Sequence, residues 1–568
     1  MERMTPDNTI TGGEAVYRVL RDQGVKKVFG LLGGSMLELF DAMHTGGEIG
    51  YIGARDERAA GHMADAYARI TGGPGVVLGA QAGPGVVNLV TAVAEAHLAY
   101  SPLVVIAGAI SRRDLGKDTF QEVDQVALFA PIAKRSILVT DPSRLAEMLR
   151  DAIRLSMSGR RGPVVLHVPR DLFAAQVECP PAGPVRIAHA GPPPADDIAA
   201  IVTMLRSCQK PVIVAGGGFK WSGGTDALQE LADTLQIPVV ASTGHADVMP
   251  HDHALFAGQG GPRGNAVASR LTREADMLLV LGARLAFNST FHSHDYISAT
   301  ARIVHVDIDA SAVGRYFEAE LGLQADATAT ARALTVCFKT QNALSSPWMP
   351  WLDEFKQARK ALQAERGAEA ADPAMPMHPR RALAEIREAL PKDAIVTLDT
   401  GNACLQAADR LAHYHAPGLV TPLDFGLVGF GYAAALGAKA AAPERPVVSI
   451  MGDGGFGFTM AEITSAVRHQ LAVVAVVLDN GAWGAEKAYQ QEFFGGRLLG
   501  ADIDSPPYDE VARLCGANGF RASTPDELKS ALQAALVSKE PSVIHVKIDP
   551  AALSTLRKDL FKPAGEKH

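Results

Sequence analysis

Residues 447–484 read VVSIMGDGGFGFTMAEITSAVRHQLAVVAVVLDNGAWG, and this stretch decides the fold. An apolar run, a glycine-rich turn, a helical segment, a second apolar run and a loop follow one another, as in a strand–helix–strand unit with parallel strands. Asp453 follows the first strand and Asn480 follows the second one. Because parallel strands end at the same edge of a sheet, these two oxygen-bearing side chains can share one hard cation.

The glycines around Asp453 predict a phosphate at the same edge. Gly452, Gly454 and Gly455 allow backbone N–H groups to approach a phosphate closely, and the start of the helix adds a favourable dipole. Magnesium prefers oxygen ligands and is usually shared with the phosphates of a substrate or cofactor. A lone GDG more often marks a tight turn, so the paired Asn480 is what favours a magnesium–diphosphate site.

This combination resembles the signature of thiamine-diphosphate enzymes, in which a GDG is followed by an NN about two dozen residues later. The chain departs from that signature by carrying Asp479 in place of the first Asn. The resemblance implies that thiamine diphosphate and Mg2+ are the cofactors. It also implies three metal ligands, which are Asp453, Asn480 and, through its carbonyl oxygen, Ala482.

Composition agrees with a large enzyme that binds small molecules. The chain has 568 residues, of which 47% are hydrophobic and 20% charged, so several sizeable cores can form. A net charge of −8 argues against nucleic acid or an acidic membrane surface as partner. Five scattered cysteines without CxxC spacing indicate a reducing compartment and no structural zinc. The polar start MERMTPDNTI has no signal-like apolar run, so we expect a cytoplasmic protein.

Alternating helix and strand signals divide the chain into three blocks. Each block predicts an open parallel sheet flanked by helices, so the fold class is α/β with three consecutive domains of this kind. A Pro- and Gly-rich linker at 179–194 separates the first two blocks. By resemblance these are a pyrimidine-binding domain, a central Rossmann-like domain, a diphosphate- and Mg-binding domain and a short tail, with the boundaries 1–185, 195–345, 375–550 and 551–568.

The first block carries a candidate catalytic carboxyl. Residues 53–69, GARDERAAGHMADAYAR, resemble the pyrimidine domain of the acetolactate synthase group. The resemblance implies that Glu57 hydrogen-bonds N1′ of the aminopyrimidine, where a partly buried carboxyl suits proton sharing. The structural alternative is that Glu57 only caps the helix expected from about Ala59, with Arg55, Arg58 or a backbone N–H as its partner.

Further segments resemble the family at single positions. FQEVDQ at 120–125 implies that Gln121 points toward the cofactor, although a glutamine in a polar loop is more often merely solvated. Val428 falls where the family places a bulky apolar wedge that orients the cofactor, and its alternative is simple helix–sheet packing. The remaining cofactor contacts implied by the resemblance are Gly401, Asn402, Gly426, Trp483 and Gly484.

The substrate is suggested by residues 399–502, which resemble sulfoacetaldehyde acetyltransferase through words such as GYAAALGAKAAAPERP and WGAEKAYQQEFFGGRLLG. That reaction splits sulfoacetaldehyde, releases sulfite and passes the acetyl group to phosphate. The chain departs from this family at Asp56, where the family has His, and at Ala82, where it has Asn. The missing side-chain amide at Ala82 removes a donor for an anionic substrate. Four cations could compensate, namely Lys487, Arg497, Arg112 and Arg113.

Other activities share the same cofactor chemistry. One is an acetolactate synthase-like decarboxylase or carboligase acting on a 2-oxo acid, and another is a 2-hydroxyacyl-CoA lyase. The central block could hold FAD, since its words GARL and HVDID resemble flavin-lining segments, but we do not expect FAD because HVDID is also a common strand end. A catalytically silent binding or regulatory subunit is a further class, against which the retained Glu57, Asp453 and Asn480 argue.

The resemblance also implies self-assembly. In this family the glutamate of one subunit meets the cofactor held by another, so we expect a homodimer or a homotetramer with active sites at the subunit interface. The partner is then a second copy of the chain, and the ligand is a small carbonyl compound. We expect no nucleic acid and no membrane partner.

Overall fold

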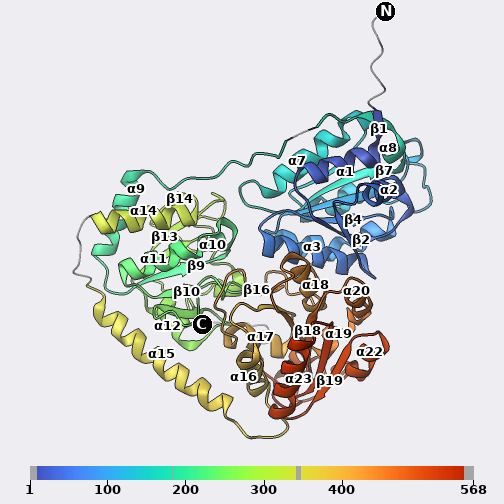
Figure 1. The fold of residues 1–568 in the computed structure, drawn as a ribbon. Helices are drawn as coiled ribbons and strands as arrows, with labels where there is room; N and C mark the ends of the chain where they lie inside the picture. The colour runs from blue at the N-terminus through green and yellow to red at the C-terminus, as the bar shows by residue number, and fades with distance from the viewer. Residues whose placement is uncertain (1–8, 182, 341–346, 556–568) are drawn as a thin grey trace, which may run out of the picture. The chain divides into compact units, whose positions relative to one another are not determined.

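The computed structural model describes residues 9–181, 183–340 and 347–555. Within these ranges the chain forms three six-stranded sheets, and every strand pair in them is parallel. A small antiparallel ribbon joins β1 (Thr9–Thr11) to β8 (Gln176–Glu178). The predicted α/β class with three consecutive parallel sheets is therefore confirmed (Figure 1).

Internal contacts divide the chain into two compact units. The first unit is Met1–Ala188 together with two later segments, Ala433–Glu444 and Thr459–Leu471. The second unit holds the rest of the chain, which includes the central and C-terminal sheets. The domain boundaries drawn from the sequence stay predictions.

The sheet of the first unit has the strand order β3-β2-β4-β5-β7-β6. Its middle strands are continuous apolar runs, as expected of parallel strands covered on both faces, and every residue of β5 is buried. The strands are β2 (Lys27–Leu31), β3 (Gly50–Gly53), β4 (Gly75–Gly79), β5 (Leu103–Ala109), β6 (Arg135–Leu138) and β7 (Val164–Pro169).

Helices cover both faces of this sheet (Figure 1). α1, α2, α7 and α8 pack their apolar sides on one face, and α3 contacts β2 and β4 from the other. The helices are α1 (Gly12–Asp22), α2 (Leu37–Gly46), α3 (Glu57–Thr71), α4 (Pro84–Val87), α5 (Val90–Leu98), α6 (Gln125–Phe129), α7 (Leu145–Met157) and α8 (Arg170–Ala174).

Two segments from the last third of the chain belong to this first unit. They contain most of α18 (Gly431–Ala441) and all of α20 (Ile463–Arg468). The Glu462 carboxylate accepts the backbone N–H of Arg55 at 2.9 Å, and the Nε2 atom of His469 accepts that of Gly53 at 2.9 Å. The loop that leads from β3 into α3 is therefore held by residues more than 400 positions away in sequence.

The central sheet of the second unit has the order β11-β10-β9-β12-β13-β14. Its strands are β9 (Pro211–Ala215), β10 (Val239–Ala241), β11 (Phe256–Gln259), β12 (Met277–Leu281), β13 (Arg302–Asp307) and β14 (Leu321–Gln324). Its helices are α9 (Ala195–Arg206), α10 (Gly217–Ser222), α11 (Thr225–Leu235), α12 (Ala266–Glu274), α13 (Phe287–Thr290), α14 (Ala327–Thr340) and α15 (Met349–Ala370).

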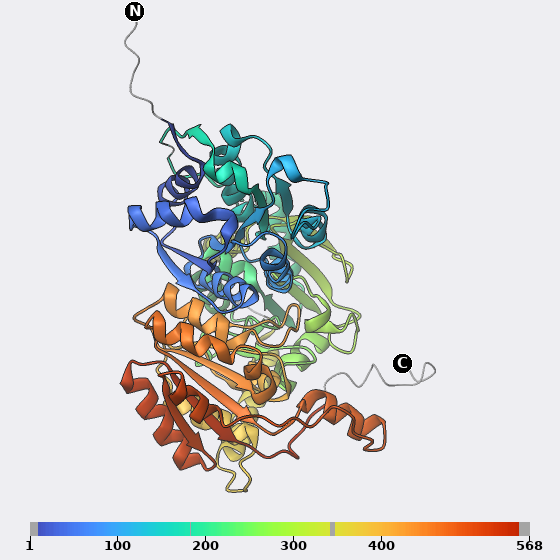
Figure 2. The same cartoon turned by 90° about the vertical axis from the view of Figure 1, so that its right-hand side faces the viewer.

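The C-terminal sheet has the order β16-β15-β17-β18-β20-β19. Helices α16, α17 and α23 share one apolar core with its central strands, and Figure 2 shows the orange and red strands of this sheet beside red helices. The strands are β15 (Ile395–Leu398), β16 (Leu419–Val420), β17 (Val447–Gly452), β18 (Val473–Asp479), β19 (Asn518–Ala522) and β20 (Ser542–Lys547). The remaining helices are α16 (Pro379–Ala389), α17 (Asn402–Arg410), α19 (Asp453–Gly457), α21 (Gly484–Phe493), α22 (Tyr508–Leu514) and α23 (Pro525–Ser538).

A buried ion pair ties the central sheet to the C-terminal one. Lys220 Nζ lies 2.9 Å from Asp247 Oδ1 and also donates to the carbonyl oxygen of Leu419. Asp247 Oδ2 accepts the backbone N–H groups of Gly418 and Leu419, so both charges are satisfied by hydrogen bonds.

Among the helices of the described residues, none is long and apolar enough to cross a membrane.

Substitution of two glycines that lie in helices tests how closely those helices pack against their neighbours. A Cβ on Gly437 in α18 would lie 1.9 Å from the carbonyl oxygen of Met63 in α3, whereas a Cβ on Gly367 in α15 would meet open space. We expect Gly437→Ala to lower the melting temperature, because overpacking against backbone costs about 1–3 kcal/mol or more. Gly367→Ala should leave the melting temperature unchanged or raise it, because alanine is favoured over glycine in a helix by up to about 1 kcal/mol. Equal melting temperatures for the two variants, measured by differential scanning fluorimetry, would contradict this packing.

Candidate active site

The deciding stretch folds as its pattern predicts. β17 and β18 pair in parallel, and Gly452 lies opposite Leu478. Asp453 therefore begins α19 at the end of β17, while Asn480 follows the end of β18 at the same edge of the sheet. Strand order reverses between β15 and β17, so the Thr400–Asn402 turn after β15 completes a crevice at this edge. Such switch points are where open α/β sheets bind ligands.

A cavity opens at this switch point. It is lined by loops that follow β15, β17, β18 and β20, by Val428 and by Pro379 at the start of α16. The sequence-predicted residues that line it are Gly401, Asn402, Val428, Gly452, Asp453, Gly454, Gly455, Asn480, Ala482, Trp483 and Gly484. Gly426 does not line it: its N–H donates to the carbonyl oxygen of Pro422 at 2.6 Å, in a tight turn with a φ of +85°.

Backbone at the rim of this cavity is open to an incoming group. A Cβ on Gly401 or Gly452 would meet nothing within 4 Å, and Gly401 has a φ of +144°, which favours glycine. A Cβ on Gly454, in contrast, would lie 2.6 Å from the Trp483 ring. The glycine loops thus offer bare backbone around an open space, which fits a diphosphate.

Asp453 is a buried carboxylate at the floor of this site. Its side chain is almost fully buried, and Ser505 Oγ donates to its Oδ2 atom at 2.8 Å. Burial raises the pKa of Asp453 above its usual range, and the negative charge of nearby Asp479 adds to this effect. The Tyr508 hydroxyl donates to the backbone carbonyl of Asp453 at 2.8 Å. A cation beside Asp453 would relieve this electrostatic cost, so the carboxylate fits a metal ion.

Asp479, the residue that departs from the thiamine-diphosphate signature, has both carboxylate oxygens engaged. Oδ1 accepts the N–H of Gly481 at 2.8 Å, while Oδ2 accepts from His545 Nε2 at 2.5 Å and from Lys547 Nζ. Burial alone would raise the pKa of Asp479, but these hydrogen bonds lower it below its usual range. Asp479 therefore stays ionised and fixes the loop, and Asn480 is left as the neighbouring side chain that lines the cavity.

A later segment folds back over the same loop. The Trp483 N–H donates to the Ala501 carbonyl at 2.7 Å, and the Ile503 N–H donates to the Gly481 carbonyl at 3.0 Å. Lys487 Nζ forms an ion pair with Asp502 at 2.6 Å. Sequence reasoning did not find this segment, because its short pairing has no periodicity that marks it as an element.

Asp399 is a site residue that sequence reasoning missed. It is fully buried at the end of β15, and its carboxylate accepts the backbone N–H groups of Thr400, Gly429 and Gly431. One side chain thereby joins the Gly401 turn to the loop that carries Val428. Burial raises the pKa of Asp399 to about 6, although these hydrogen bonds oppose the shift. The sequence signal that could have revealed this residue is the run Asp399-Thr400-Gly401 directly after a buried strand.

The first unit places Glu57 at the first position of α3. Asp56 caps this helix by accepting the N–H of Arg58 at 2.7 Å, so the capping role weighed for Glu57 belongs to its neighbour. Asn88 Nδ2 donates to Glu57 Oε2 at 3.0 Å, and the Glu57 side chain is buried. The second carboxylate oxygen faces Gly85, where a Cβ would lie 2.8 Å away.

Gln121 lies in the same unit, in a loop with a φ of +68°. Its Oε1 atom accepts from Gln81 Nε2 at 2.6 Å. Arg112 and Arg113, the two candidate donors to an anionic substrate in this unit, already have carboxylate partners. Arg112 pairs with Asp171 at 2.7 Å, and Arg113 pairs with its neighbour Asp114 at 3.2 Å. In the described residues, no group of three His, Cys, Asp or Glu side chains converges as a metal cluster.

Comparison with known proteins defines the class of this fold and site. Sequence models described as thiamine pyrophosphate enzyme domains match residues 10–128 (N-terminal TPP binding domain), 198–334 (central domain) and 399–546 (C-terminal TPP binding domain). The chain belongs to the thiamine pyrophosphate enzymes.

Curated relatives place it in the acetolactate synthase-like group of that family. It is 32% identical to the sulfoacetaldehyde acetyltransferase of Alcaligenes xylosoxydans xylosoxydans, over 93% of this chain and 90% of that protein. It is also 32% identical to the sulfoacetaldehyde acetyltransferase of Castellaniella defragrans, over 98% and 96%. The same identity holds for the acetolactate synthase isozyme 3 large subunit of Escherichia coli K12, over 93% and 92%.

The raised pKa of Asp399 predicts how a substitution depends on pH. A folded-state pKa of about 6, above the ordinary 3.8, means that the native protein binds the proton more tightly than the unfolded chain. This contribution to stability is present below about pH 4 and is lost as pH rises through 6, by about 3 kcal/mol. In the Asp399→Asn variant the side chain has no titratable proton. Its NH2 group would face backbone N–H groups, two donors against each other, so we expect the variant to be less stable than the wild type. Its loss of melting temperature should be larger at pH 5 than at pH 7.5; a larger loss at pH 7.5 would contradict the assignment.

Proposed function

We propose that this chain is a thiamine-diphosphate- and Mg2+-dependent enzyme that converts sulfoacetaldehyde and phosphate to acetyl phosphate and sulfite. The observation that carries the proposal is the cavity at the β15–β17 switch point, which gathers eleven residues chosen from sequence alone. The choice of substrate rests on the C-terminal resemblance and on relatives that are themselves sulfoacetaldehyde acetyltransferases.

The second unit would hold the diphosphate and the metal. Asp453 and Asn480 would ligate Mg2+ through side-chain oxygens and Ala482 through its carbonyl oxygen, with diphosphate oxygens completing the shell. The bare backbone at Gly401 and Gly452 would face the phosphates. When bound, thiamine diphosphate supplies a nucleophilic carbon and an electron sink for the departure of a leaving group.

Residues of both units would orient and protonate the cofactor, and those of the first unit would serve the cofactor held by another subunit. The buried Glu57 carboxyl would hold a proton at N1′ of the aminopyrimidine, and Asn88 keeps it in place. Val428 would orient the cofactor, and Asp399 holds the loop that carries Val428. Gln121, held by Gln81, would face the cofactor from the loop that follows β5.

A second candidate is an acetolactate synthase-like carboligase or decarboxylase that acts on 2-oxo acids. It is favoured by a relative of that kind, whose 32% identity to this chain equals that of the acetyltransferases. In addition, three candidate donors to a sulfonate already form ion pairs, namely Arg112, Arg113 and Lys487. Ala82 is also buried, and its N–H donates to Ser35 Oγ, so that position offers no side-chain donor. A 2-hydroxyacyl-CoA lyase remains the third reading, and FAD is not part of the proposal.

The active enzyme is proposed to be a homodimer or homotetramer in the cytoplasm. The support is the family resemblance, in which the glutamate of one subunit serves the cofactor of another. No step of the chemistry calls for a nucleic acid or a membrane.

Two substitutions separate the proton role from the binding role. Glu57→Gln should reduce turnover by more than about 100-fold, because an amide cannot share a proton with N1′, while leaving cofactor affinity within a few-fold. Asp453→Ala should instead lose Mg2+-dependent binding of thiamine diphosphate. Calorimetry and steady-state rates on both variants check this. Near-normal turnover in Glu57→Gln, or unchanged affinity in Asp453→Ala, would defeat the respective role.

The substrate is tested by a coupled product assay. With Mg2+, thiamine diphosphate, sulfoacetaldehyde and phosphate, we expect sulfite and acetyl phosphate to appear in equal amounts. If no sulfite is released from sulfoacetaldehyde, and acetolactate forms when pyruvate is supplied in its place, the acetyltransferase proposal is wrong and the carboligase is supported.

A further inference from the structure

A buried hydrogen-bond chain lies behind the turn that contacts Glu57. It begins at Gly83, whose N–H donates to Gln125 Oε1 at 2.9 Å, and Gly83 has a φ of +69°. Gln125 Nε2 then donates to the Gly108 carbonyl at 3.1 Å and lies 3.2 Å from His167 Nδ1. The far ring nitrogen of His167 lies 2.9 Å from Ser136 Oγ.

The partners of this chain fix the direction of every bond. Gln125 must present oxygen to the Gly83 N–H and nitrogen to the Gly108 carbonyl, so its second amide hydrogen points at His167 Nδ1. Nδ1 is then an acceptor, and Nε2 carries the proton and donates to Ser136 Oγ. The Ser136 hydroxyl donates in turn to the Val126 carbonyl at 3.0 Å. A neutral His167 is required, and burial lowers its pKa to about 4, which keeps it neutral near pH 7.

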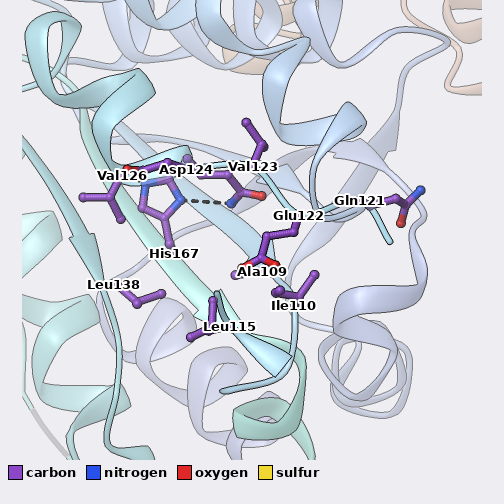
Figure 3. Close-up of a pocket in the computed structure, with 11 residues that line it drawn as sticks. Ala109, Ile110, Leu115, Gln121, Glu122, Val123, Asp124, Val126, Leu138 and His167 are labelled. Carbon is purple, nitrogen blue, oxygen red and sulfur yellow. Dashed lines mark hydrogen bonds between the residues drawn. The ribbon is translucent and has the colours of Figure 1, made fainter. Parts of the chain in front are cut away.

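Gln125 and His167 also line a small cavity at the carboxyl ends of β5, β6 and β7 (Figure 3). Its other walls are largely apolar and include Ile110, Leu115 and Leu138. The dashed line in Figure 3 that ends on His167 is its bond with Gln125. Because the amide of Gln125 and both ring nitrogens of His167 are engaged by protein groups, they serve the fold of this region rather than a ligand in the cavity.

The turn held by this chain contacts both candidate catalytic residues of the first unit. A Cβ on Gly83 would lie 2.2 Å from the Gln121 carbonyl oxygen, and a Cβ on Gly85 would lie 2.8 Å from Glu57 Oε1. Gln81, at the start of the turn, donates to Gln121 Oε1 and accepts the Gly34 N–H through its own Oε1. A shift of this turn would therefore move Glu57 and Gln121 together.

We propose that Gln125 and His167 are positioning residues, which lock the Gln81–Gly85 turn and through it set the geometry of Glu57 and Gln121. The inference rests on the proposed function for the roles of those two residues, but the lock itself is a property of the protein without cofactor. Gln125 and His167 are buried and their polar atoms are satisfied by one another and by the backbone, so removing one side chain leaves a buried polar partner unpaired.

Hydrogen–deuterium exchange on the cofactor-free protein tests the lock. Gln125→Met keeps the side-chain length but removes the acceptor of the Gly83 N–H, so peptides covering 81–88 should exchange roughly 2- to 10-fold faster, the factor of one lost hydrogen bond. Gln23→Met is the matched control, because Gln23 also bonds two backbone groups of this unit, the Val185 N–H and the Gly183 carbonyl. It should leave exchange at 81–88 unchanged. Unchanged exchange in Gln125→Met would overturn the lock, whatever the reaction of the enzyme.

Kinetics on the holoenzyme test the consequence. Gln125→Met and His167→Leu should lower kcat by about 10- to 100-fold with little change in KM or cofactor affinity, because orientation and not binding is lost. His167→Asn keeps an acceptor at the Nδ1 position and should recover most of kcat, and Ser136→Ala, at the far end, should lose little. A wild-type kcat in Gln125→Met despite faster exchange, or no difference between His167→Asn and His167→Leu, would overturn the positioning role. Failure of the proposed function would show separately, as an inactive wild type.

Discussion

The parallel pairing of β17 with β18 is the constraint on which the site depends. Since Gly452 lies opposite Leu478, the two strands end in register, and the turns that follow them face the same space. β15 lies on the other side of β17, and the reversal of strand order there opens the crevice that these turns line. A slip of two residues in this register would carry Asp453 away from Asn480 by about 7 Å, more than the span of one cation shell.

Buried carboxylates hold the loops of this site at an electrostatic cost. Asp399 and Asp453 both have raised pKa values because they are desolvated, whereas Asp479 is kept ionised by His545 and Lys547. Asp399 compensates its burial with backbone N–H groups, and a bound cation would do the same for Asp453.

Sequence patterns were sufficient for the sheets and for the floor of the cavity. Continuous apolar runs predict buried parallel strands, and glycines or short polar residues directly after them mark the functional edge, which is how the pattern indicates Asp453 and Asn480. Gly401 is indicated by the family resemblance instead. Local patterns could not reveal partners that are distant in sequence. Glu462 and His469 hold the loop before Glu57, and Asp399 joins two loops. These depend on side-chain packing, which no periodicity encodes.

The central claim is that the second unit binds thiamine diphosphate through a magnesium ion at the β17–β18 edge. Isothermal titration calorimetry of the wild-type protein with thiamine diphosphate, with Mg2+ and then with EDTA in its place, tests this claim most directly. We predict saturable binding near one equivalent per chain with Mg2+ and at least about 10-fold weaker binding without it, since Asp453 and Asn480 would hold the phosphates through the metal. Absence of binding in both titrations, or equal affinity in both, would contradict the account.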